Sequence, residues 1–172
     1  MAYALLIDDD TVLTSGLAQL AQSEGLDLRT ASSWEQGLAL FHSIRPVLVI
    51  ADYNLPGSLH GLRLLLTISR LRPSVRMLLV SAYLNESDVA RVEQLGLVDR
   101  VLRKLDGVAT NRILLEEIRD AAAHANDDTD WVAFAEANRR AAAVSEDDLN
   151  QLDGFLQASR LPGAAGNDRA GG

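Results

Sequence analysis

Short, continuous runs of apolar residues alternate along the chain with segments in which apolar residues recur every three or four positions. The apolar runs cover residues 2–7, 47–51 and 75–80, and residues 26–30 and 97–102 are two further strand candidates. Runs of this length, bounded by polar residues, are typical of buried strands, whereas the three- and four-residue spacing is typical of amphipathic helices. The pattern therefore predicts strands and helices in regular alternation.

Polar residues and glycines mark where the predicted helices begin and end. Ser32 with Glu35, and Asn85 with Asp88, have the spacing of helix capping boxes. The predicted helices end before Gly25, at Ile44, before Pro73 and before Gly96, and a fifth covers about residues 110–125.

Five strands that alternate with five helices predict an α/β fold over residues 1–125, with a doubly wound five-stranded parallel sheet and helices on both of its faces. In such sheets, ligands bind at the carboxyl ends of the strands. We therefore expect the chemistry of the chain at that edge.

Residues 126–160 predict a helical extension, and residues 161–172, rich in Gly and Ala, predict a disordered tail. Two apolar stripes at helical spacing lie in the extension, the first containing Trp131 and Phe134 and the second containing Leu149, Leu152, Phe155 and Leu156. Ser145 and Asp148 are expected to cap the second helix. Helices this short are marginal alone in water. The stripes must be buried on the chain's own surface, in a homodimer or in a target protein. We expect docking against the last sheet edge and its flanking helices, near Tyr83 and Val101.

Composition narrows the class of protein. The 172 residues carry a net charge of −8 and include no cysteine, which excludes disulfides and Cys-ligated zinc. The acidity argues against nucleic acid as a partner. No apolar run approaches the roughly 18 residues of a membrane span, and the first strand lacks the basic flank of a signal peptide. We expect a cytoplasmic protein that binds neither nucleic acid nor membrane.

Polar residues converge at the predicted carboxyl ends of four strands: Asp8 and Asp9 after the first, Asp52 after the third, Ser81 after the fourth and Lys104 after the fifth. Carboxylates gathered at one edge repel one another unless a cation lies among them, and all-oxygen ligation suits Mg²⁺. Lys104 is the single lysine beside fifteen arginines. An ammonium is a compact point charge that a planar guanidinium cannot replace, so we expect a specific role for Lys104.

These residues lie in segments that resemble the receiver domain of two-component response regulators, a flavodoxin-like fold. The segments read LLIDDD, VIADYNLPG, LLVSAY and VLRKL, and the resemblance covers residues 1–125. It implies a signalling switch, and the net charges of −3 over residues 1–125 and −5 over residues 126–172 lead us to expect one without a DNA-binding domain. Such a switch takes a phosphoryl group from a histidine kinase or phosphotransfer protein, acts on an output protein, and catalyses only its own phosphotransfer and acyl-phosphate hydrolysis.

The resemblance also implies a role for each site residue. Asp52 corresponds to the aspartate that accepts the phosphoryl group. Asp9 corresponds to a direct Mg²⁺ ligand and Asp8 to a ligand acting mainly through water, and the backbone carbonyl of Asn54 completes the metal site. Ser81 and Lys104 correspond to the hydroxyl and the ammonium that contact the phosphoryl oxygens.

The chain departs from the family pattern at several positions. Leu105 stands where the family usually has a proline in a cis peptide, so we expect a trans peptide there, because a non-proline cis bond costs about 3–4 kcal/mol. Val101 replaces the family's switch aromatic, and Tyr83 could substitute for it or shield the phosphoryl group. The loop from Asp52 to Gly61 is one residue longer than usual.

Two other functions fit parts of the pattern. A haloacid-dehalogenase-like phosphohydrolase would use Asp8 and Asp10 in its Asp-x-Asp motif, but it would leave Asp52 without a role. A pseudo-receiver would keep the fold as a protein-binding module without phosphotransfer. The identity of the phosphorylated aspartate, if any, distinguishes these alternatives.

Overall fold

The computed structural model describes residues 2–56, 60–125, 136 and 143–158. The strands are β1 (Tyr3–Ile7), β2 (Asp27–Ala31), β3 (Leu48–Asp52), β4 (Arg76–Ser81) and β5 (Arg100–Arg103). The helices are α1 (Thr11–Ser23), α2 (Trp34–Ile44), α3 (Gly61–Leu71), α4 (Glu86–Leu95), α5 (Gly107–His124) and α7 (Glu146–Ala158). All strand pairs are parallel, in the order β2-β1-β3-β4-β5. The predicted α/β fold is confirmed.

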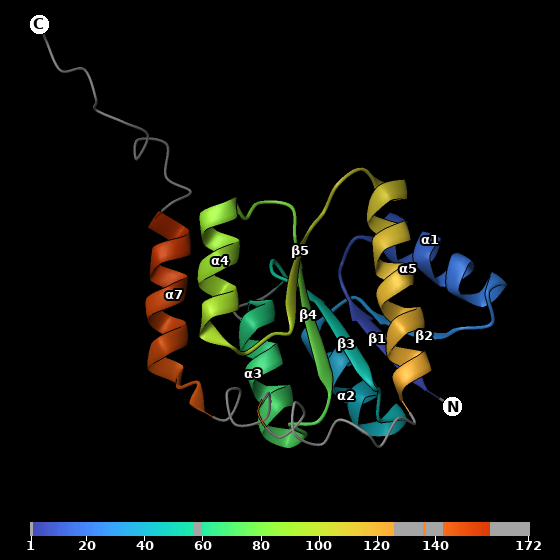
Figure 1. Ribbon diagram of the computed structural model, residues 1–172, viewed down its shortest axis with the longest axis horizontal. Coiled ribbons are helices and arrows are strands. Elements are labelled where there is room, and N and C mark those ends of the chain that lie inside the picture. The colour runs from blue at the N-terminus through green and yellow to red at the C-terminus, as the bar shows by residue number, and fades with distance from the viewer. Residues whose placement is uncertain (1, 57–59, 126–135, 137–142, 159–172) are drawn as a thin grey trace, which may run out of the picture.

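Helices cover both faces of the sheet, with α1 and α5 on one face and α2, α3 and α4 on the other (Figure 1). Successive side chains of a strand point to opposite faces. In β3, Leu48 and Ile50 therefore join the core under α1 and α5, and Val49 and Ala51 join the core under α2, α3 and α4. Both faces need apolar residues, which explains why the inner strands β1, β3 and β4 are rich in apolar residues along their whole length.

Several predicted element boundaries are wrong, among them the following three. The side chain of Ser33, not Ser32, caps α2 by accepting the N–H of Gln36. The fifth strand starts at Arg100, three residues later than expected. The last helix of the sheet unit starts at Gly107, earlier than expected, because the carboxylate of Asp106 accepts the N–H of Ala109 and caps the helix there. In contrast, the capping box of Asn85 and Asp88 is present as expected.

The C-terminal helix α7 packs outside the sheet unit, beside α4 (Figure 1). Its Ser145 and Asp148 cap it reciprocally, as expected. The apolar stripe of α7 is buried in the core that also contains residues of α3 and α4. The expected docking on a helix that flanks the last strand is confirmed for α7, which packs against α4 and shares a core with Val101. Tyr83 stays 71% exposed, so the contact expected near Tyr83 is wrong. The charges explain the difference, because arginines on α3 and α4 contact α7.

Other predictions for the C-terminal part lie outside the described residues, namely the helix around Trp131 and Phe134 and the disordered tail. None of the helices in the described part of the chain is long and apolar enough to span a membrane.

Close packing of α3 against the end of β3 requires glycine at position 61. A Cβ atom on Gly61 would overlap the backbone carbonyl of Asp52. The N–H of Gly61 also donates to the carbonyl of Tyr53 at 3.0 Å. Gly61 thus lets the first turn of α3 lie directly against the strand end that carries Asp52.

We expect Gly61→Ala to lower the free energy of unfolding by about 1–3 kcal/mol, because backbone must move to admit the methyl group. Gly107→Ala is the matched control, since Gly107 is also the first residue of a helix but has open space around it. Urea denaturation measures both variants. Equal unfolding free energies for the two variants would contradict the account.

Candidate functional site

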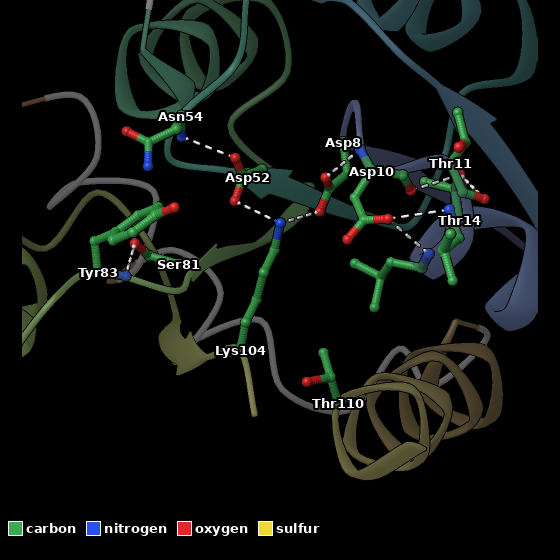
Figure 2. Close-up of polar contacts among 12 residues, drawn as sticks. Asp8, Asp10, Thr11, Thr14, Asp52, Asn54, Ser81, Tyr83, Lys104 and Thr110 are labelled. Carbon is green, nitrogen blue, oxygen red and sulfur yellow. Dashed lines mark hydrogen bonds and ion pairs between the residues drawn. The ribbon is translucent and has the colours of Figure 1, made fainter. Parts of the chain in front are cut away.

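A lysine ammonium lies between two carboxylates at the carboxyl ends of three strands (Figure 2). Lys104, directly after β5, places its Nζ 2.7 Å from Oδ2 of Asp8 and 2.9 Å from Oδ1 of Asp52. Asp8 follows β1 and Asp52 ends β3. The parallel sheet therefore brings together residues that lie as far apart as positions 8 and 104.

Burial and close contacts change the pKa values of Asp8 and Lys104 in this cluster. Asp8 is only 1% exposed, and burial raises its pKa, while the contacts with Lys104 and the N–H of Asp10 act in the opposite direction. Burial alone would lower the pKa of Lys104, but its hydrogen bonds and charge interactions with Asp8 and Asp52 raise the pKa above its ordinary value. The lysine is therefore a fixed positive charge at the site.

Three carboxylates of the cluster could share a cation. Oxygens of Asp8, Asp9 and Asp52 lie within 4.8 Å of one another, with Asp9 exposed and the other two buried. One lysine balances only one of three negative charges. An oxygen-only set with an open, exposed side matches the ligands that Mg²⁺ prefers while it keeps some of its waters. The residues present thus fit a bound Mg²⁺.

Hydrogen bonds to backbone N–H groups orient the other oxygens of the two buried carboxylates. Oδ2 of Asp52 accepts the N–H of Asn54 at 2.9 Å, and Oδ1 of Asp8 accepts the N–H of Asp10 at 2.9 Å. The role expected for the Asn54 carbonyl stays a prediction. Because these contacts fix both side chains, the oxygens face the space between the strand ends.

Ser81 lies at the end of β4 and is buried. Its Oγ accepts the N–H of Tyr83 at 3.2 Å, and its carbonyl accepts the N–H of Lys104 at 2.8 Å. The pairing of β4 with β5 therefore sets Ser81 beside the lysine. Val101 is buried in the apolar core, on one face of the edge strand.

The side chain of Asp10 has a different task from that of Asp8. It accepts the N–H groups of Val12 and Leu13, both at 3.0 Å, and so caps α1. The cluster of carboxylates found among the described residues does not include it. This geometry disfavours the Asp8 and Asp10 pair that a phosphohydrolase would use.

A threonine that sequence reasoning did not single out holds the loop after Lys104. The Lys104–Leu105 peptide is trans, as expected. The N–H of Leu105 donates to Oγ1 of the buried Thr110 at 2.8 Å. A proline at position 105 would have no N–H to donate, so this bond depends on the departure from the family pattern. The only signal in the sequence is a threonine five residues after Leu105.

A comparison with models of known protein families identifies the family of this chain. The family model of the response regulator receiver domain matches residues 4–115. The chain belongs to the response regulator receiver family. This membership confirms the expected family and excludes the haloacid-dehalogenase-like alternative as the family of residues 4–115.

Two curated relatives of this chain are a transcriptional regulatory protein and a response regulator. AfsQ1, a transcriptional regulatory protein of Streptomyces coelicolor, is 30% identical over 96% of this chain and 75% of its own length. NarL, the nitrate/nitrite response regulator of Escherichia coli, is 31% identical over 88% of this chain and 69% of its own length. Other relatives are matched over much less, such as NtrX of Azorhizobium caulinodans, of which 21% is covered.

Solved receiver structures have the same fold. The receiver domain of an HD domain-containing protein from Pseudomonas fluorescens is 29% identical and has a TM-score of 0.60 over 72% of this chain and 95% of that one. NtrX from Brucella abortus is 26% identical with a TM-score of 0.61 over 76% of this chain and 29% of that one.

We expect Thr110→Val to lower the free energy of unfolding by about 1–3 kcal/mol, because it leaves the N–H of Leu105 without its hydroxyl acceptor. Thr110→Ser keeps the hydroxyl and is the control, expected to lie much closer to wild type. Urea denaturation measures both. A Val variant as stable as the Ser variant would show that the hydroxyl does not support this loop.

Proposed function

We propose that the chain accepts a phosphoryl group on Asp52 from a phosphohistidine of a histidine kinase or phosphotransfer protein, and that it acts as a signalling switch. The observation that carries the proposal is the ammonium of Lys104, held 2.7 and 2.9 Å from the carboxylates of Asp8 and Asp52. A fixed positive charge beside the carboxylate of Asp52 supports this role, because it offsets charge on an incoming phosphoryl group. Receiver domains are signalling domains, and the family match supports this role.

In the proposed transfer, an oxygen of Asp52 forms a bond to phosphorus as the bond from phosphorus to the imidazole nitrogen breaks. The electron pair of the broken bond stays on the imidazole, which takes up a proton. Phosphoryl transfer depends mainly on positioning and on stabilising charge on the phosphoryl oxygens. Lys104 supplies positive charge beside those oxygens, and the Ser81 hydroxyl donates to one of them.

Asp8 and Asp9 would hold Mg²⁺ together with Asp52 and the backbone carbonyl of Asn54. When bound, Mg²⁺ supplies positive charge that offsets the charge of the phosphoryl oxygens and of the carboxylates. The cluster of oxygens within 4.8 Å supports this assignment. Lys104 then serves as the second positive charge of the site.

The switch resets when water attacks the phosphorus, releases inorganic phosphate and leaves the carboxylate of Asp52. We propose that the output is a contact with another protein. The net charges of −3 over residues 1–125 and −5 over residues 126–172 support a protein partner rather than nucleic acid.

Asp52→Asn is expected to abolish the phosphoryl adduct that the wild type forms with acetyl phosphate and Mg²⁺, because an amide is not a nucleophile here. Asp27→Asn, at the amino end of β2 on the far edge of the sheet, is the control and should react as wild type. Intact-protein mass spectrometry measures the adduct. An adduct retained at Asp8 in the Asp52→Asn variant would contradict the proposal, and a wild type that never reacts would favour the pseudo-receiver.

Lys104→Arg is expected to slow phosphorylation about tenfold or more although it keeps the charge, because a planar guanidinium does not fit between two carboxylates spaced for an ammonium. Arg103→Lys, the reciprocal change at the exposed neighbouring position, is the control and should have no effect. Rates come from the time course of adduct formation. Equal rates for wild type and Lys104→Arg would refute the specific role of the ammonium.

A further inference from the structure

The side chain that follows Asp52 connects the phosphorylation site to the C-terminal helix. Tyr53 points to the opposite face of the sheet from Asp52 and is only 1% exposed. Its ring stacks on His60, with centroids 5.3 Å apart. Its hydroxyl donates to Oδ1 of Asp153 in α7 at 3.3 Å. Consecutive residues of one strand end thus serve the phosphoryl site and α7.

The helix α7 and the surface beneath it have opposite charges. Four of the thirteen residues of α7 are acidic and none is basic. On α3, Nε of Arg63 lies 3.6 Å from Oδ2 of Asp153, and Nη1 of Arg70 lies 2.8 Å from Oε1 of Glu146. These pairs give α7 a defined position on this face.

Apolar contacts hold α7 in the same place. Leu149, Leu152 and Leu156 are buried in the core shared with α3 and α4. The guanidinium of Arg91 in α4 lies 3.6 Å from the ring centroid of Phe155, a cation–π contact. The helix nevertheless lies outside α3 and α4 rather than on the sheet (Figure 1). No strand pair of the sheet involves α7, so the five strands can stay paired when this peripheral helix detaches.

We expect a phosphoryl group on Asp52 to disturb the segment that holds Tyr53. Oδ1 of Asp52 pairs with Lys104 and Oδ2 accepts the N–H of Asn54, so a new bond at either oxygen displaces one of these contacts. Tyr53 lies between Asp52 and Asn54, and its carbonyl accepts the N–H of Gly61 at the start of α3. A shift here moves the hydroxyl away from Asp153.

We propose, on the basis of the proposed function, that docking of α7 and phosphorylation of Asp52 oppose each other through the Tyr53–Asp153 contact, so that phosphorylation releases α7 and uncovers the α3–α4 face. The uncovered face is an apolar surface flanked by arginines. Release of α7 is then the output of the switch, in place of the family's aromatic residue, which this chain lacks at Val101.

Two linked measurements on the full chain test the coupling, with beryllofluoride and Mg²⁺ as the mimic of the phosphoryl group. In the wild type, saturating beryllofluoride is expected to lower hydrogen-exchange protection of residues 146–158 about fivefold or more. Because coupling between two sites is reciprocal, Tyr53→Phe, which removes the hydroxyl, is expected to raise the affinity for beryllofluoride several-fold. Asp147→Asn is the matched control, because this exposed α7 carboxylate should leave the affinity unchanged.

A second variant covers the case in which Tyr53→Phe perturbs Asp52 directly. Leu149→Ala weakens α7 docking from a buried position in α7 itself and should also raise the affinity. Protection that is unchanged or increased by beryllofluoride, or affinities that are equal in wild type and Leu149→Ala, would overturn the coupling while the proposed function stands. A wild type that neither binds beryllofluoride nor forms an adduct would overturn the proposed function, and with it the coupling.

Discussion

The ammonium of Lys104 between Asp8 and Asp52 is the interaction on which the site depends. Two buried carboxylates at adjacent strand ends repel each other, and the lysine offsets that repulsion at 2.7 and 2.9 Å. Asp8 follows β1, Asp52 ends β3 and Lys104 follows β5. The contact therefore forms only when these strands are aligned in one parallel sheet. Fold and chemistry are thus coupled, because the same pairing that buries the apolar strands aligns the charged groups at their ends.

The end of β3 lies where two parts of the molecule meet. Asp52 points toward Lys104, and Tyr53, in phase with Val49 and Ala51, points toward α3 and α7. Gly61 allows the start of α3 to lie against the carbonyl of Asp52. In the coupling we propose, a change at the carboxylate is transmitted through one peptide unit to the acidic helix α7 on its arginine-bearing face.

The sheet and the residues at its strand ends could be predicted because they depend on local patterns. Continuous apolar runs identify buried strands, and parallel pairing places Asp8, Asp52 and Lys104 at one edge whatever the detailed register. Features that depend on tertiary contacts could not be predicted. The Tyr53–Asp153 contact joins residues 100 positions apart, and Thr110 is recognised only from its bond to the N–H of Leu105. Ser32 and Ser33 are adjacent candidates for the cap of α2, and the spacing of residues in the sequence does not decide between them.

The central claim is that Asp52 is the residue that carries the phosphoryl group, and trapping the acyl phosphate tests it most directly. Borohydride reduces an aspartyl phosphate to homoserine and leaves free carboxylates unchanged. After incubation of the full chain with acetyl phosphate and Mg²⁺, reduction and peptide mapping should find homoserine at position 52 alone. Homoserine at position 8, or at neither position, would contradict the account.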